Sequence, residues 1–172
     1  MKAFVATVVG PDRPGLMDTL SKTIEAAGGN WLESRMTHLG GHFAGIVRVE
    51  VADETQLLQT MNNIEGLSVT LHPDQPGHVG SPQELTLELV GQDRPGIVHQ
   101  ITAALARHSV NIEDFSSEVE SAPMSGEMLF SATITVGLPA GCELEALRAE
   151  LEKIAEDLMC DFKFDSRAAL HA

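Results

Sequence analysis

The chain contains no tyrosine, one tryptophan and two cysteines among its 172 residues. Aromatic residues make up only 4% of the sequence, so a sheet of stacked aromatic side chains, as in RNA-recognition domains, is not expected. Cys142 and Cys160 both lie in the C-terminal half and are too few for a disulfide framework or a zinc cluster. No stretch approaches the ~18 apolar residues of a membrane span, and the first residues do not resemble a signal peptide. The sequence therefore predicts a cytoplasmic protein without a membrane segment.

Basic residues are also scarce. The chain has 11 Lys and Arg and 25 Asp and Glu, which gives a net charge of −14. The imbalance is uneven: residues 1–72 hold five basic and eight acidic groups, whereas residues 83–165 hold five and 16. Such a surface would repel a phosphate backbone, so no direct nucleic-acid binding is expected. Two interpretations of the acidity stay open: a site for a basic protein partner, or a solvated face that keeps the protein in solution.

The residues needed for catalysis are poorly represented. Cys142 precedes a predicted helix, which can lower the pKa of a thiol, but no histidine is adjacent to it in the sequence. Among the seven histidines only His38 and His42 flank one predicted hairpin, and two ligands alone make a weak metal site. We predict no catalytic residue, no metal and no organic cofactor.

The most informative feature that is present is a repeated hexapeptide. Gly-Pro-Asp-Arg-Pro-Gly at residues 10–15 returns as Gly-Gln-Asp-Arg-Pro-Gly at residues 91–96, and the offset of 81 also superposes Leu16 on Ile97 and Asn30 on Asn111. A repeat of this length is a duplicated domain. We predict domains at residues 1–72 and 83–165, a linker at residues 73–82 and a C-terminal tail at residues 166–172.

Each copy shows the same order of apolar periodicities. Alternation at residues 3–9 predicts a strand, and helical spacing follows each Asp-Arg-Pro-Gly, with the proline in the first helical turn. Two extended runs, a second helix and a last strand complete the copy, at residues 31–38, 43–51, 54–64 and 67–71, and then at residues 112–119, 128–136, 144–158 and 160–164. A hairpin connection four residues longer in the second copy aligns Phe43 with Met128. The order β-α-β-β-α-β predicts an α+β fold of two ferredoxin-like domains, each an antiparallel sheet with helices on one face.

The turn between the first strand and helix of each copy is a candidate anion site. Free backbone amides at a helix start favour a carboxylate, and Gly15 and Gly96 would allow close approach to the backbone. The lysine of a nucleotide-triphosphate loop and the dinucleotide glycine fingerprint are both missing, which disfavours phosphate cofactors. The alternative is a plain strand-to-helix turn in which Asp12 and Asp93 cap the helices.

The strand order, the Pro-Gly at the first helix and the Asn that opens the second strand together resemble the ACT domain family. Here these residues are Asp12-Arg13-Pro14-Gly15 with Asn30, and Asp93-Arg94-Pro95-Gly96 with Asn111. The resemblance covers nearly the whole chain as two copies. The tandem without a catalytic domain is similar to the group that represses the glycine cleavage system.

The resemblance implies a regulatory module whose ligand, often an amino acid, sits between two ACT domains near the first loop and the second strand. It assigns ligand binding to Asp12, Arg13, Pro14, Gly15, Leu16 and Asn30 in the first copy, and to Asp93, Arg94, Pro95, Gly96, Ile97 and Asn111 in the second. Loop amides would hold a carboxylate, and each Asn side chain would offer a donor and an acceptor to the head group. An Asn that only forms a turn is the alternative reading.

These observations predict a sensor of glycine or a similar small amino acid. It would repress the glycine cleavage system through a DNA-binding activator protein rather than on DNA. The alternative is a regulatory subunit that controls an enzyme of amino-acid metabolism. Exposed sheet edges favour a homodimer over a monomer whose two copies pair internally.

Overall fold

The computed structural model describes residues 1–75, 77, 81 and 83–165. It divides the chain into two compact units between His78 and Val79, and each unit is described by itself. The predicted C-terminal tail, residues 166–172, lies outside the described residues, as do residues 76, 78–80 and 82 of the predicted linker.

Both units contain four strands and two helices in the order β-α-β-β-α-β. Unit 1 consists of β1 (Lys2–Pro11), α1 (Leu16–Ala26), β2 (Asn30–Leu39), β3 (His42–Val51), α2 (Glu54–Asn62) and β4 (Ser68–Pro73). Unit 2 consists of β5 (Gln83–Gln92), α3 (Ile97–Arg107), β6 (Asn111–Ser121), β7 (Met128–Leu138), α4 (Leu144–Leu158) and β8 (Cys160–Asp165).

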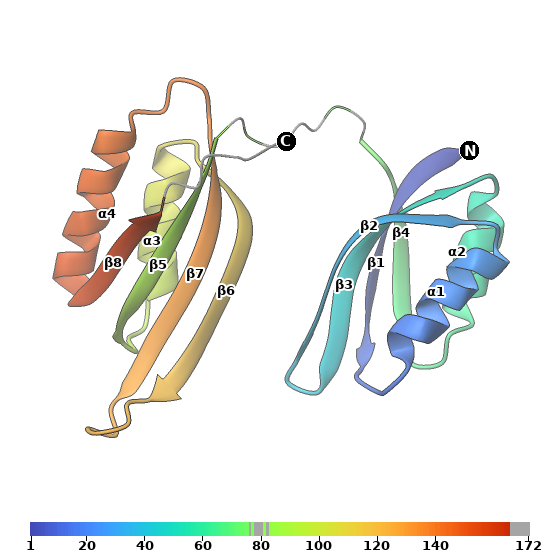
Figure 1. The fold of residues 1–172 in the computed structure, drawn as a ribbon, viewed down its shortest axis with the longest axis horizontal. Coiled ribbons are helices and arrows are strands. Elements are labelled where there is room, and N and C mark those ends of the chain that lie inside the picture. The colour runs from blue at the N-terminus through green and yellow to red at the C-terminus, as the bar shows by residue number, and fades with distance from the viewer. Residues whose placement is uncertain (76, 78–80, 82, 166–172) are drawn as a thin grey trace. The chain divides into compact units, whose positions relative to one another are not determined.

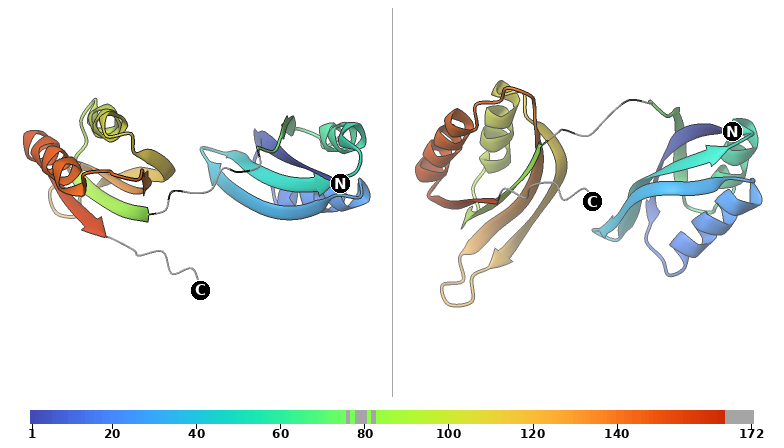
Figure 2. Two further views of the ribbon diagram at one scale, coloured as in Figure 1. Left: turned by 90° about the horizontal axis from the view of Figure 1, so that it is seen from above. Right: turned by 45° about the horizontal axis from the view of Figure 1, so that its top comes forward.

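Each unit forms one antiparallel sheet, in the order β2-β3-β1-β4 in unit 1 and β6-β7-β5-β8 in unit 2. Within each unit both helices lie on the same face of the sheet, and the other face carries no helix of that unit (Figures 1 and 2). We call this second face the open face. The predicted α+β class and ferredoxin-like topology are confirmed.

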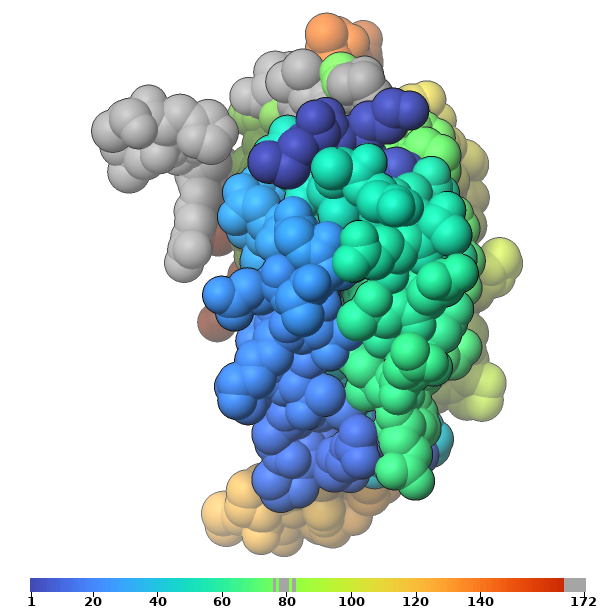
Figure 3. Space-filling view, turned by 90° about the vertical axis from the view of Figure 1, so that its right-hand side faces the viewer, coloured from blue at the N-terminus to red at the C-terminus, as the bar shows by residue number. Residues whose placement is uncertain are grey.

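The alternation of β1 decides which residues enter the core of unit 1. Phe4, Ala6 and Val8 are buried between sheet and helices, while Val5 and Thr7 point to the open face. The helices complete the core with side chains at helical spacing, namely Leu16, Leu20 and Ile24 of α1 and Leu57 and Met61 of α2. In the space-filling view of Figure 3, the blue surface of the α1 region lies beside the blue-green surface of the α2 region on this side of unit 1. The buried core of unit 2 is a separate cluster that shares no residue with that of unit 1.

The helix boundaries differ from the prediction in two places. Helices α1 and α3 begin at Leu16 and Ile97, after Gly15 and Gly96 as N-caps, so the prolines precede the helices rather than lying in their first turns. Helix α2 ends at Asn62 instead of Ile64. The apolar spacing placed the end of this helix too late, because Ile64 is buried although it lies after the helix.

The predicted alignment of Phe43 with Met128 is wrong. In the sheet Phe43 lies opposite Gly10, and the residue opposite Gly91 is Phe130. Both phenylalanine side chains are buried, so they occupy one core position in the two copies. The loop of residues 122–127 is four residues longer than that of residues 40–41, as predicted, but β6 and β7 are also each one residue longer than β2 and β3.

The two edge strands β2 and β6 share an irregularity at equivalent positions. The register with the neighbouring strand shifts between Trp31 and Glu33 in unit 1 and between Ile112 and Asp114 in unit 2. A bulge of this kind adds one residue and reverses which side chains face which side of the sheet. Trp31 therefore lies opposite the buried Val49, whereas Glu33 lies opposite Arg48 on the open face.

Candidate functional site

The predicted anion-binding turns have the same geometry in both units. Gly15 and Gly96 adopt left-handed conformations with φ of 82° and 90°, and no side chain caps either helix. The first helical hydrogen bonds run from Thr19 N to Gly15 O at 2.9 Å and from Gln100 N to Gly96 O at 3.0 Å. The amides of the first helical turn are therefore left without an intrahelical acceptor. The alternative role of Asp12 and Asp93 as helix caps is wrong.

The two arginines of the motifs make different contacts. Arg13 donates from Nη2 to the backbone oxygen of Glu65 at 3.0 Å, which ties the turn to the loop before β4. Arg94 donates to Gln92 Oε1 at 3.2 Å. Among the described residues neither arginine forms an ion pair with the aspartate beside it. Both stay exposed or half-exposed, so they remain available near the turns.

The first turns of α1 and α3 differ in charge. Helix α1 carries Asp18 in its first turn, paired with Lys22 at 2.7 Å, whereas α3 has no acid there and has His99 at the equivalent position. A carboxylate already at the helix start repels an incoming anion. The turn at Gly96 is therefore the better local acceptor for a ligand carboxylate.

The predicted Asn30 does not meet the turn of its own unit. Asn30 lies opposite Glu50, which lies opposite Ala3 at the start of β1, whereas Asp12 follows the other end of β1 and bonds Gly41 O. Nine residues along the strand from Ala3 to Asp12 correspond to about 30 Å. A small amino acid cannot span this distance, so one unit alone does not bring the two predicted features together.

The two asparagines also differ from each other. Asn111 donates from Nδ2 to Glu113 Oε1 at 2.8 Å, so part of its hydrogen-bonding capacity is used. No partner for the exposed side chain of Asn30 is found in the part of the chain that the structure describes. Trp31, which follows it, is half-buried against the core of unit 1 and donates from Nε1 to Ser34 Oγ at 3.2 Å, as expected for a packing residue.

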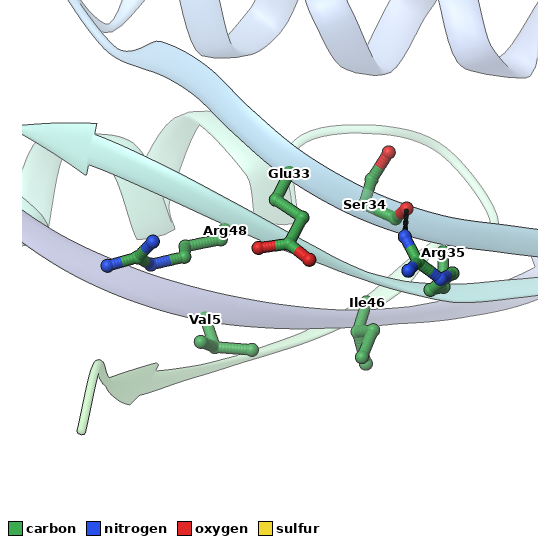
Figure 4. A pocket seen from close by; sticks show the side chains of 6 residues that line it. All are labelled: Val5, Glu33, Ser34, Arg35, Ile46 and Arg48. Atoms are coloured by element: carbon green, nitrogen blue, oxygen red, sulfur yellow. Dashed lines mark hydrogen bonds between the residues drawn. The ribbon is translucent and has the colours of Figure 1, made fainter. Parts of the chain in front are cut away.

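The sequence did not predict a hollow of about 180 Å³ on the open face of unit 1. Its lining residues come from three strands: Val5 of β1, Glu33, Ser34 and Arg35 of β2, and Ile46 and Arg48 of β3. Figure 4 shows Glu33 between the two arginines, with the aliphatic side chains on the neighbouring strands. Only the cross-strand register, which depends on the bulge, brings these residues together.

The open face of unit 2 gathers much of its acidity. Seven of the 16 acidic residues between positions 83 and 165 lie there with one basic residue, Lys163. The seven are Glu84, Glu88, Asp114, Glu118, Glu120, Asp161 and Asp165, and all are exposed. This sheet face thus carries an excess of six acidic over basic side chains.

The histidines and cysteines are the candidates for metal-binding or reactive chemistry. Within residues 1–75 and 83–165, no group of three or more His, Cys, Asp or Glu could hold a metal ion. His38 Nδ1 lies 4.0 Å from Asp12 Oδ2, and His42 Nδ1 lies 3.2 Å from Gly40 O. Cys142 does precede α4, while burial raises the pKa of the Cys160 thiol. No helix of the described residues is long and apolar enough to cross a membrane.

The chain thus consists of two small ferredoxin-like units in tandem, each with an uncapped helix start next to a glycine turn. The comparisons with known proteins agree. The ACT domain profile matches residues 2–72 and 83–165, and the chain belongs to this family. ACT domains are regulatory modules, so the chain is a regulatory protein.

Several relatives match this chain over most of its length. The glycine cleavage system transcriptional repressor of Escherichia coli K12 is 22% identical over 165 residues, which cover 90% of this chain and 85% of that protein. A protein of unknown function from Galdieria sulphuraria has a crystal structure with a TM-score of 0.88 and 27% identity, covering 97% of this chain and 99% of that one. A solved structure assigned to the glycine cleavage system repressors has a TM-score of 0.68 and 19% identity over 96% and 98% of the two chains, and shows the shared fold.

Proposed function

We propose that this protein senses a small amino acid, with glycine as the first candidate, and regulates transcription in response. The ACT family assignment of both units supports an amino-acid ligand. The observation that carries the proposal is the pair of uncapped helix starts at Gly15 and Gly96, because such a turn presents amides that suit a carboxylate. Glycine is suggested by the name of the Escherichia coli relative.

The two copies do not contribute equally in this proposal. The turn at Gly96, with His99 in its first helical turn, is the favoured carboxylate site, and Asn30 is the asparagine whose side chain has no partner among the described residues. Because a turn and its own asparagine lie at opposite ends of a unit, the two features are separate candidates within each unit. Asp12, Arg13, Pro14 and Leu16, with Asp93, Arg94, Pro95, Ile97 and Asn111, remain the wider candidate set.

We further propose that the regulation acts through a DNA-binding activator protein. The acidic open face of unit 2 supports contact with a protein rather than with a phosphate backbone. The relative's name as a transcriptional repressor supports the direction of the effect. The ligand would shift the equilibrium between forms that engage and release the activator by about 1–3 kcal/mol.

Affinity purification of the tagged full chain from its native cells, with and without glycine, tests the partner. The proposal expects a DNA-binding protein whose recovery changes with glycine, and loss of that change in the Asn30→Ala variant. Recovery of a metabolic enzyme would instead support control of catalysis. Recovery that is the same with and without every amino acid tried would contradict ligand-dependent regulation.

A further inference from the structure

The hollow on the open face of unit 1 depends on the bulge in β2. If β2 ran on from Trp31 in strict alternation without the bulge, Glu33 and Arg35 would point towards the helices. With it, Glu33 lies opposite Arg48 and Arg35 lies opposite Ile46. An acidic and a basic side chain thus stand two residues apart on the same face of one strand.

Among the described residues, the ion pairs include neither Glu33 nor Arg35. The charge of Glu33 still acts on Arg48, which lies opposite it in the neighbouring strand. Arg35 donates only to the neighbouring Ser34 O, at 3.1 Å. Arg48, in contrast, is held in place by Asp74, whose Oδ2 accepts from its Nε at 3.0 Å. The hollow therefore has one guanidinium, that of Arg48, held by Asp74, while Glu33 and Arg35 lie beside it outside any ion pair of the described residues (Figure 4).

The neighbouring strands supply an apolar floor. Val5 is half-buried and Ile46 is 47% exposed, which leaves aliphatic surface in contact with water between the charges. A volume of about 180 Å³ exceeds what one water occupies and falls below the roughly 300–1,000 Å³ of pockets for drug-sized ligands. A molecule the size of an amino acid fits this range.

We propose that this hollow binds a free aliphatic α-amino acid, in a site separate from the glycine turns. The ligand carboxylate would accept hydrogen bonds from Arg35, its ammonium group would donate to Glu33, and its side chain would cover Val5 and Ile46. A ligand with only one charge would leave Glu33 or Arg35 without a partner and would face the repulsion of the like charge. The combination of both charges with an apolar floor selects a zwitterion with a branched aliphatic side chain over glycine.

The second copy provides a comparison within the chain. At the positions of Arg35 and Ile46, unit 2 has Ser116 opposite Thr133, and at those of Glu33 and Arg48 it has Asp114 opposite Thr135. The position of Val5 is taken by Thr86. The equivalent place in unit 2 thus lacks both guanidinium groups and the aliphatic floor, so we place the site in unit 1 alone.

The test is NMR titration of the full chain with L-leucine, following the methyl signals of Val5 and Ile46. The same titration with glycine, 4-methylpentanoate and 3-methylbutylamine separates the zwitterion from ligands that lack the side chain, the ammonium or the carboxylate. We expect L-leucine to shift these signals saturably and the three analogues to bind at least about tenfold more weakly. Arg35→Ser and Ile46→Thr, which install the residues of unit 2, should each weaken L-leucine binding about tenfold or more.

Asp114→Asn, at the position of Glu33 in unit 2, is the matched control and should leave L-leucine binding unchanged, whereas Glu33→Gln should weaken it. Equal binding of 4-methylpentanoate would overturn the role of Glu33. Unshifted methyl signals up to the solubility limit of L-leucine would overturn the site. Shifts confined to the amides near Gly15 and Gly96 would also overturn it, while supporting the proposed function at the turns.

Discussion

At the scale of single residues, two glycines shape the candidate ligand sites. Gly15 and Gly96 adopt left-handed conformations that an L-residue adopts only with strain, and each stands where the strand has ended and the helix begins. A glycine here keeps the helix start uncovered, because no capping side chain competes for the free amides. These residues thus serve the local fold and the proposed carboxylate site together.

Replacement of Gly15 should test this conformational requirement. Gly15→Ala is expected to lower the free energy of unfolding by about 1 kcal/mol, because no atom lies within 4 Å of the added Cβ and only backbone strain opposes it. Gly15→Asn should cost less, since Asn tolerates left-handed backbone. Urea unfolding of both variants provides the measurement, and an alanine variant as stable as the parent would contradict the account.

The sequence predicted the glycine turns better than it predicted the partners of the side chains around them. Proline, glycine and a following amphipathic pattern are local signals, so the strand-to-helix turn was visible in the motif itself. Whether Asp12 or Gly15 occupies the cap position depends on backbone angles that the motif does not encode. The hollow around Glu33 and Arg35 was missed because a single extra residue in β2 reverses the direction of both side chains.

At the scale of elements, α3 and α4 are joined by a cluster of charged side chains. Arg107 at the end of α3 donates from Nε to Glu150 Oε1 at 2.8 Å, and His108 Nε2 lies 2.6 Å from Glu150 Oε2. Hydrogen bonds from Arg107 and from His108 hold the pKa of Glu150 below its usual range. The ionised carboxylate therefore stabilises the packing of the two helices.

This cluster makes a pH-dependent prediction. Because the folded pKa of Glu150 is lowered, its contribution is fully present above the unfolded pKa of about 4.3 and is lost as the pH falls through the folded value. Glu150→Gln should reduce stability by about 1 kcal/mol at neutral pH and by less at about pH 3. Urea unfolding at both pH values tests this, with the exposed Glu152→Gln as control. An equal loss at both would contradict an ionic contribution.

The elements themselves were predictable because each alternates or repeats clearly. Phe4, Ala6 and Val8 are all buried in the core, as the alternation predicted. The predicted alignment of the two hairpins was wrong. The sequence alone does not show how many of the extra residues lie in the loop and how many lengthen the strands, because that depends on which residues lie opposite each other in the sheet. The equivalence of Phe43 and Phe130 is visible only from the sheet, where each lies opposite the corresponding glycine.

At the scale of the whole molecule, the chain consists of two units with separate cores. Leu20 belongs to the core of unit 1 and Leu151 to that of unit 2, and both are fully buried. Trp31, the only tryptophan, packs against the core of unit 1. Its fluorescence should therefore report the unfolding of unit 1 alone.

Core variants should reveal whether the units unfold independently. Leu20→Ala is expected to destabilise unit 1 by about 2–5 kcal/mol and to shift the urea transition seen by Trp31 fluorescence. Leu151→Ala should leave that transition in place while shifting part of the circular dichroism signal. A common shift of both signals in either variant would show that the units unfold as one cooperative body.

The central claim, that this tandem ACT protein senses a small amino acid at its glycine turns, is tested most directly by thermal unfolding of the full chain against a panel of amino acids. A ligand at 100 times its dissociation constant adds about 2.7 kcal/mol and should raise the midpoint by several degrees. We predict a rise with glycine or a close analogue, lost in Asn30→Ala, reduced in His99→Asp and retained in Arg35→Ser. No rise with any amino acid, or a rise that is the same in all three variants, would contradict the claim.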